Sequence, residues 1–194
     1  MGKEKYLKDV KRLFEKSPVV RFSSILRIVR TKKKVKQYSK KLIRNLILKE
    51  GIRKLTKGYY TIYDDPSLLV YCFDPSYLGL QDAMSYHNIW EQEAIPIIIT
   101  PRKVRQGVRK VLGMNVLIRR ISKKYFFGFD YCKHKNFYLP YSDIEKTFVD
   151  MVYFKEKLSA DVIKSIKKRI DKKKLNSYLK NYPEKVKRKV LRYL

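Results

Sequence analysis

The sequence has no long apolar run and few cysteines, and each shortage excludes a class of protein. No stretch approaches the ~20 apolar residues that an α-helix needs to cross a bilayer, and Met1–Lys11 has no apolar core of signal-peptide length. Cys72 and Cys132 are far apart, and only His134 lies close to Cys132, too little for a tetrahedral zinc site. We therefore expect a cytoplasmic protein with two buried thiols and no membrane partner.

Residues that commonly carry catalysis are also scarce. His87 and His134 are the only histidines, and the sequence contains no glycine-rich phosphate loop, nucleophile elbow or metalloprotease helix. A histidine beside a helix end is more often a hydrogen-bonded structural residue than a general base. We therefore expect a protein that is not an enzyme, with no catalytic residues, no metal and no cofactor.

Acidic residues are few, and basic residues outnumber them at both ends of the chain. Lys and Arg number 47 against 18 Asp and Glu, a formal net charge of +29. Residues 1–64 hold 20 cations against 5 anions, residues 65–154 hold 12 against 9, and residues 155–194 hold 15 against 4. Compositional drift, as in a thermostable protein, is one explanation. However, Asp65–Thr100 has no Lys or Arg, so the pattern favours a polyanion, most simply nucleic acid, held by the ends.

Three helices are expected before residue 52. Apolar residues at four-residue spacing indicate a first helix over Tyr6–Phe14. A short second helix follows, with Ser23 or Ser24 as its expected N-cap. The third helix is expected over Lys36–Glu50 and ends at Gly51, a residue type suited to a left-handed C-terminal cap.

A β-hairpin is expected after the third helix. Ile52–Leu55 and Tyr59–Tyr63 have strand character and flank the turn Thr56-Lys57-Gly58. Three helices followed by a hairpin predict a winged helix-turn-helix, a DNA-binding domain over residues 1–64. Asp64-Asp65-Pro66 then interrupts the pattern and marks the expected domain boundary.

The third helix is expected to pack with one face and to meet DNA with the other, because its side chains separate at about 100° per residue. The expected packing face is Ser39, Leu42, Ile43 and Leu46. A recognition helix needs groups that hydrogen-bond to base edges as well as cations for phosphates, and Gln37 and Asn45 are such groups. The expected DNA-binding residues, including those flanking this helix, are Lys32, Lys33, Lys34, Lys36, Gln37, Lys40, Lys41, Arg44, Asn45, Arg53 and Lys57.

Residues 65–154 predict a mixed α/β domain with a small, mostly antiparallel sheet. A helix is expected around Leu80–His87. The expected strands are Ile95–Thr100, Asn115–Ile121, Tyr125–Tyr131 on the far side of the Ser122-Lys123-Lys124 turn, and Asn136–Leu139. Ser142 and Glu145 predict a capping box for a helix over Asp143–Phe154.

Residues 155–194 predict a basic helical tail packed on the second domain or continuing it. Narrow apolar stripes run among many Lys and Arg residues, without the Trp- and Phe-rich face of a membrane-surface helix. These cations either extend the contact with DNA phosphates, meet RNA or an acidic partner, or form a solvated face. The whole chain is therefore expected to be α+β.

A group of charged residues suggests a nuclease as an alternative function. Asp130, Asp143, Glu145 and Lys146 are types that hold Mg²⁺ and a water molecule. The expected helix cap accounts for the same residues without a metal. A metal-dependent nuclease is therefore retained as an alternative hypothesis.

Four stretches of the sequence resemble AbiEi-type antitoxins of type IV toxin–antitoxin systems and related winged-helix transcriptional regulators. They are Leu42–Leu46 through Lys57–Tyr60, Pro75–Leu78 to Ala83–His87, the strand run before Thr100-Pro101, and Asp143–Asp150. The sequence departs from that family's pattern at Asn88, where a glycine is common, and in its strongly basic tail.

The resemblance implies a winged-helix domain that binds inverted repeats in its own promoter, and a C-terminal α/β domain with antitoxin activity. The implied counterpart is a nucleotidyltransferase-like toxin, opposed without a stable complex. We therefore expect a sequence-specific DNA-binding transcriptional autorepressor, with a homodimer on duplex DNA as a further expectation. The alternatives are a regulator without a toxin, a non-specific chromatin or RNA-binding protein, and the nuclease.

Overall fold

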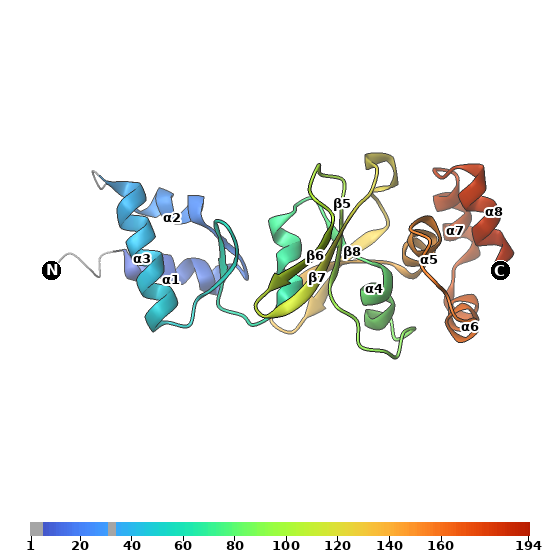
Figure 1. Cartoon of the computed structure of the whole chain (residues 1–194), viewed down its shortest axis with the longest axis horizontal. Helices are drawn as coiled ribbons and strands as arrows, with labels where there is room; N and C mark the ends of the chain where they lie inside the picture. Colours follow the sequence, from blue (N-terminus) through green and yellow to red (C-terminus); the bar gives the residue numbers. More distant parts are fainter. Residues whose placement is uncertain (1–5, 31–33) are drawn as a thin grey trace.

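The computed structural model describes residues 6–30 and 34–194 of the chain, which form an elongated molecule (Figure 1). The helices α1–α3 lie at one end, a mixed sheet occupies the middle, and α6–α8 lie at the other end with the C-terminus (Figure 1). The α+β class expected from the sequence is confirmed. Within the described residues, none of the helices combines the length and the apolar character needed to cross a bilayer.

The N-terminal elements are three helices and a small antiparallel sheet. They are α1 (Leu7–Lys16), β1 (Val20–Arg21), α2 (Phe22–Ile28), α3 (Val35–Lys49), β2 (Arg53–Thr56) and β3 (Tyr59–Thr61). The strand order is β1-β3-β2, so β1, which the sequence did not predict, lies beside the expected hairpin. Val10, Phe14, Ile25 and Leu46 are buried together in a core between the helices.

The expected cap of α2 is wrong. The helix begins at Phe22, so Ser23 and Ser24 lie inside its first turn, and no side chain caps it. The reason is the pairing of β1 with β3, which brings the hairpin turn next to the start of α2. The Phe22 N–H therefore donates to the Gly58 carbonyl at 2.8 Å, and this backbone contact satisfies a donor at the helix start.

The expected end and packing face of α3 are both confirmed. Gly51 follows the helix with a φ of +65°, the left-handed region that favours glycine. The four side chains expected on the packing face are buried; they are Ser39, Leu42, Ile43 and Leu46. The position of the exposed face of α3 is therefore fixed by its apolar periodicity.

The middle of the molecule is a six-stranded mixed sheet with the order β6-β7-β5-β4-β9-β8. Its elements are η1 (Pro66–Cys72), β4 (Tyr77–Leu78), α4 (Leu80–Tyr86), β5 (Ile97–Thr100), β6 (Gly107–Val111), β7 (Met114–Arg120), η2 (Lys123–Tyr125), β8 (Phe129–His134), β9 (Phe137–Ser142) and α5 (Ile144–Tyr153). Three strand pairs are antiparallel, and two pairs, β4 with β9 and β5 with β7, are parallel. The sheet therefore has six strands, two more than the four that the sequence predicted, and is mostly antiparallel as expected.

Two expectations for this region need correction. The strand expected over Tyr125–Tyr131 begins only at Phe129, and it lies at the opposite edge of the sheet from β6 and β7 because the chain crosses over through η2. The capping box is also wrong, because Ser142 is the last residue of β9. Asp143 caps α5 instead, and its carboxylate accepts the Lys146 N–H at 2.7 Å.

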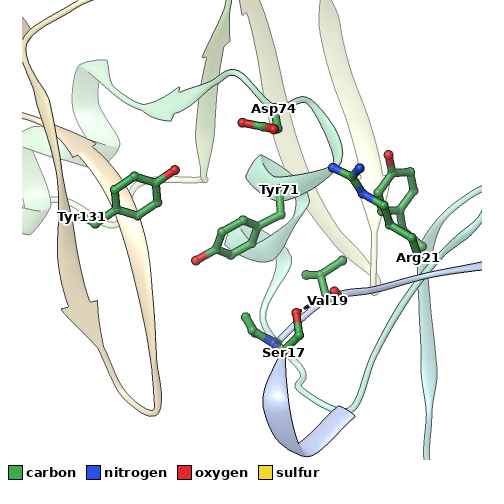
Figure 2. Close-up of a pocket in the computed structure, with 8 residues that line it drawn as sticks. Ser17, Val19, Arg21, Tyr71, Asp74 and Tyr131 are labelled. Carbon is green, nitrogen blue, oxygen red and sulfur yellow. Dashed lines mark hydrogen bonds between the residues drawn. The ribbon is translucent and has the colours of Figure 1, made fainter. Parts of the chain in front are cut away.

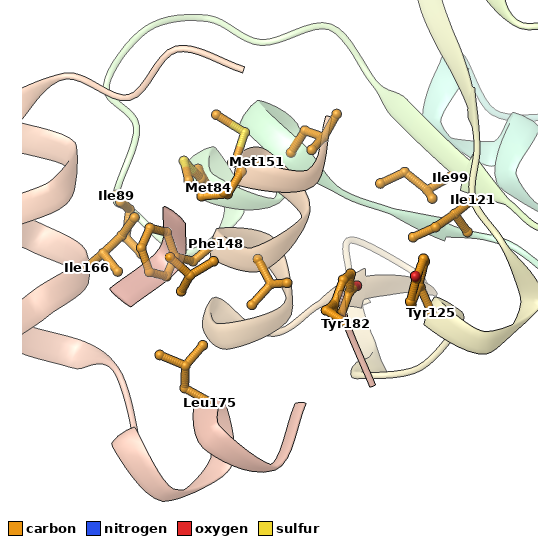
Figure 3. Close-up of a cluster of buried hydrophobic side chains, with 14 of the residues drawn as sticks. Met84, Ile89, Ile99, Ile121, Tyr125, Phe148, Met151, Ile166, Leu175 and Tyr182 are labelled. Carbon is orange, nitrogen blue, oxygen red and sulfur yellow. The ribbon is translucent and has the colours of Figure 1, made fainter. Parts of the chain in front are cut away.

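The tail forms α6 (Ala160–Arg169), α7 (Lys172–Leu179) and α8 (Glu184–Arg192), all close to α5. Figure 3 shows the apolar cluster that joins them, with Phe148 of α5 near Ile166 and Leu175 of the tail. Tyr182 extends the cluster toward the sheet, because its ring stacks on Tyr125 at 4.3 Å between centroids. The tail is thus packed on the second unit by an apolar core.

Candidate nucleic-acid interface

The solvent face of α3 gathers six of the predicted DNA-binding residues. All six are exposed; they are Lys36, Gln37, Lys40, Lys41, Arg44 and Asn45. At about 100° per residue, Gln37, Lys40, Lys41 and Arg44 lie opposite the buried face, and Lys36 and Asn45 lie on its two flanks. The helix lies at the end of the molecule away from the mixed sheet (Figure 1). We call these six residues the α3 basic face.

Within the described residues, the cations of the α3 basic face have no acidic partner. In the described part of the chain, no carboxylate lies within ion-pair distance of Lys36, Lys40, Lys41 or Arg44. The nearby acidic residue Glu50 pairs instead with Lys11 of α1, at 2.8 Å. The α3 basic face therefore presents net positive charge together with the amides of Gln37 and Asn45, the chemistry that phosphates and base edges require.

The other predicted DNA-binding residues lie around α3. Lys34 is exposed just before the helix, and Lys57 is exposed at the turn between β2 and β3. Arg53 is exposed but is held by Asp64, with 3.0 Å between Nη1 and Oδ1, so part of its charge is already neutralised. The two further predicted residues, Lys32 and Lys33, lie outside the described residues.

The N-terminal sheet is anchored to the mixed sheet at the expected boundary. Asp65 is buried, and its carboxylate accepts the Ser67 N–H at 3.0 Å and contacts His134 Nε2 at 3.0 Å. The ring of Tyr63 packs edge-on against Phe137 with 5.0 Å between centroids. The chain at the boundary is therefore fixed by side-chain contacts to the second unit.

A cavity of about 320 Å³ lies at this junction. Figure 2 shows Tyr131 of β8 on one side and Arg21 of β1 on the other, with Tyr71 between them. The Tyr71 hydroxyl donates to the Tyr138 carbonyl. Burial, and then the neighbouring Tyr131, raise the pKa of Tyr71 to about 12, so its hydroxyl stays protonated at neutral pH. The cavity is a polar junction between the two sheets.

Two acidic residues of the nuclease hypothesis, Asp143 and Glu145, make structural contacts. Asp143 caps α5 and also contacts Lys174 at 3.0 Å, while Glu145 accepts the Asp171 N–H at 2.8 Å. Asp130 is exposed on β8. Within residues 6–30 and 34–194, no three His, Cys, Asp or Glu side chains group to hold a metal ion. These contacts give the acidic residues roles in capping α5 and in docking the tail.

The histidines and cysteines also occupy structural positions. His87 Nε2 lies 2.7 Å from the Ser142 carbonyl, and His134 contacts Asp65. Cys72 is buried, and burial raises the pKa of its thiol to about 12, whereas Cys132 is only half-buried. The expectation of two buried thiols is therefore correct for Cys72 and wrong for Cys132, because Cys132 lies on β8, an edge strand.

Lys146 has a buried environment that sequence reasoning missed. Its side chain is fully buried, and its Nζ pairs with Asp150 and lies 2.9 Å from the Tyr77 hydroxyl and 3.1 Å from the Tyr182 hydroxyl. Burial lowers the pKa of Lys146, and burial raises the pKa of Asp150. The only sequence signal is the spacing of four residues between a lysine and an aspartate inside an apolar helix stripe.

Comparison with known proteins identifies a fold but not a family. No family model and no curated protein matches the chain. Among solved structures, the crystal structure of RV2827C protein from Mycobacterium tuberculosis is similar, with a TM-score of 0.63 and 13% sequence identity. The match covers 98% of this chain and 75% of that chain, so it extends over the N-terminal elements, the mixed sheet and the tail.

Proposed function

We propose that residues 1–64 form a winged helix-turn-helix and that the protein is a sequence-specific DNA-binding transcriptional autorepressor. The α3 basic face carries this proposal, because it combines exposed cations, which lack an ion-pair partner among residues 6–30 and 34–194, with the exposed amides of Gln37 and Asn45. The hairpin of β2 and β3 after α3 supports the same interpretation, with Lys57 at its turn.

In this proposal α3 enters the major groove of duplex DNA. Arg44, Gln37 and Asn45 hydrogen-bond to base edges, and each lost base contact costs about 1–3 kcal/mol of binding free energy. Lys40 and Lys41 contact phosphates, which raises affinity for all duplexes without distinguishing sequences. Lysines flanking α3 and the Lys57 turn extend the phosphate contacts.

The antitoxin part of the proposal rests on the resemblance to AbiEi-type antitoxins. In this proposal residues 65–154 oppose a nucleotidyltransferase-like toxin in the cytoplasm without a stable complex. A homodimer on inverted repeats gives each half-site one α3, since protein two-fold symmetry mirrors the repeat. The proposed protein is a regulator without catalytic activity.

Binding to the upstream DNA of the protein's own gene tests the proposal. We expect this fragment to bind at least about ten-fold more tightly than a scrambled duplex of equal length, about 1.4 kcal/mol, with a preference that persists as salt rises. Arg44→Ala should reduce this preference, whereas Arg12→Ala, which removes the same charge from the exposed side of α1, should leave it unchanged.

The exposed cations of the tail favour a second candidate, a non-specific chromatin or RNA-binding protein. In that case the upstream and scrambled duplexes would bind alike, and both affinities would fall together as salt rises. Equal binding of the two duplexes would therefore exclude the autorepressor and support the second candidate.

A further inference from the structure

A second basic site lies at the edge of the mixed sheet where β5 and β7 end. These strands are parallel, and Thr100 of β5 is in register with Arg120 of β7, so the chain leaves both strands at the same edge. Strand β6 begins at this edge because it is antiparallel to β7. The carboxyl ends of parallel strands are a common location of ligand sites in α/β sheets.

The segments that meet there form an open cavity of about 980 Å³. Its basic lining is Arg102 and Lys103 from the chain after β5, Arg120 at the end of β7, and Lys123 at the start of η2. Tyr153 of α5 also lines the cavity. The four cations are all exposed and come from two separate segments, so the fold brings them together.

Hydrogen bonds fix these segments to one another. The Ile121 N–H donates to the Thr100 carbonyl at 3.0 Å, and the Arg102 N–H donates to the Thr100 hydroxyl at 3.2 Å. The Arg120 N–H donates to the Gln106 side-chain oxygen at 2.9 Å. The backbone around the cavity is therefore held by the sheet, which pre-organises the positions of its cations.

The cavity has no counter-charge from its own segment. Residues 101–129 contain nine Lys and Arg and no Asp or Glu. Neighbouring Arg119 pairs with Glu156 at 3.0 Å, but in the described part of the chain Arg102, Lys103, Arg120 and Lys123 have no such partner. A concave surface lined by one sign of charge concentrates ions of the opposite sign.

We propose that this cavity binds phosphate groups, at least two of them adjacent, as in a nucleoside diphosphate or a polynucleotide backbone. Arginine suits this role because its guanidinium pairs with phosphate oxygens through two parallel hydrogen bonds, and lysine adds point charge. The site is separate from the α3 basic face, and its existence does not depend on the proposed autorepressor function.

Nuclear magnetic resonance of the full chain with inorganic pyrophosphate, at constant ionic strength, tests the site. We expect the chemical shifts of the backbone amides of Gln106, Arg120 and Ile121 to change and to reach saturation as pyrophosphate is added. The variant Lys103→Gln/Lys123→Gln should weaken binding at least about ten-fold. The control Lys133→Gln/Lys157→Gln, which removes the same charge at two exposed positions outside the cavity lining, should leave binding unchanged. Shifts that never saturate, or an equal loss in both variants, would overturn the proposal.

A single-stranded oligothymidylate distinguishes the two sources of phosphate. If it displaces pyrophosphate from the same amides and binds more tightly, the ligand is a polynucleotide. If pyrophosphate saturates these amides and the oligonucleotide leaves them unchanged, the ligand is a small phosphorylated molecule. Arg44→Ala should preserve the pyrophosphate shifts, so loss of DNA recognition at α3 and loss of the cavity site give different results.

Discussion

Helices α3 and α5 place lysine in opposite environments. Lys40 and Lys41 of α3 are exposed and lack an ion-pair partner among the described residues, whereas Lys146 of α5 is fully buried against Asp150. Burying a charge is costly unless it is paired and hydrogen-bonded. Lys146 meets both conditions, because it pairs with Asp150 and donates hydrogen bonds to the hydroxyls of Tyr77 in β4 and Tyr182 in the tail. The charge on α3 is therefore exposed to solvent and ligands, whereas the charge on α5 joins the helix to the sheet and the tail.

The first prediction contrasts these two lysine environments by truncation. Lys146→Ala should lower the free energy of unfolding by about 3–5 kcal/mol, because it leaves Asp150 buried without its counter-charge. Lys40→Ala should change it by no more than about 0.5 kcal/mol, as expected for an exposed position. Urea denaturation followed by circular dichroism measures both.

A double variant separates loss of the charge pair from loss of packing. Lys146→Met/Asp150→Leu removes both charges and keeps apolar volume, so it should recover much of the lost stability, since hydrophobic replacement of a buried pair is often neutral. An equally small loss for Lys146→Ala and Lys40→Ala would contradict the contrast between the two helices.

The properties of α3 could be predicted from sequence because they are local. A helix places its side chains on faces by spacing alone, so Leu42 and Leu46 identify the buried face and leave Arg44 exposed. Lys146 could not be placed in this way. Its partners Tyr77 and Tyr182 come from distant parts of the chain, and a lysine four residues before an aspartate is usually an exposed pair.

The cavity at the ends of β5 and β7 could not be predicted either, because it also depends on contacts between distant parts of the chain. Strand order in the sheet follows from non-local pairing, and the parallel register of Thr100 with Arg120 has no local sequence signature. Strand β6 was also missed, although its pairing with β7 completes this edge. The absence of acidic residues from 101 to 129 was a usable signal, but it became specific only once the fold placed those cations together.

The second prediction extends the comparison to a carboxylate, Asp82 of α4, which accepts the Ile97 N–H at 3.2 Å. Burial raises the pKa of Asp82 to about 7, Asp65 adds to this increase, and the hydrogen bond from Ile97 opposes it. The folded state therefore holds this proton more tightly than the unfolded state. The contribution of this proton to the free energy of unfolding is therefore fully present below a pH of about 4, and it is lost as the pH rises through about 7.

Asp82→Asn isolates this contribution. The stability difference between wild type and Asp82→Asn should shrink or reverse in favour of the variant as the pH rises from about 4 to about 7, because only the wild type loses its bound proton. Thermal unfolding at a series of pH values measures the difference. Because the residue is half-buried, solvent reduces the size of the effect but not its direction. A difference that is constant across this range would show that Asp82 titrates normally in the folded protein.

The smallest expected effect comes from the tail, where a half-exposed, paired lysine and an exposed lysine are neighbours in one helix. Lys174 of α7 contacts Asp143 at 3.0 Å and Glu145 at 3.6 Å, whereas neighbouring Lys173 is exposed. Burial alone would lower the pKa of Lys174. The hydrogen bond to Asp143, together with the negative charges of Asp143 and Glu145, outweighs burial, so the pKa of Lys174 is raised. Lys174→Gln should therefore cost about 0.2–1 kcal/mol of stability, and less at high salt.

Lys173→Gln is the matched control for Lys174→Gln, since it removes the same charge from the adjacent residue without breaking an ion pair in the described part of the chain. Urea denaturation at low salt should show a lower free energy of unfolding for Lys174→Gln than for Lys173→Gln. At high salt this difference should disappear. If both variants behave alike at low salt, the contact of Lys174 with Asp143 does not help to dock the tail. The apolar cluster around Leu175 and Phe148 would then hold the tail by itself, leaving Lys174 as available to a polyanion as Lys173.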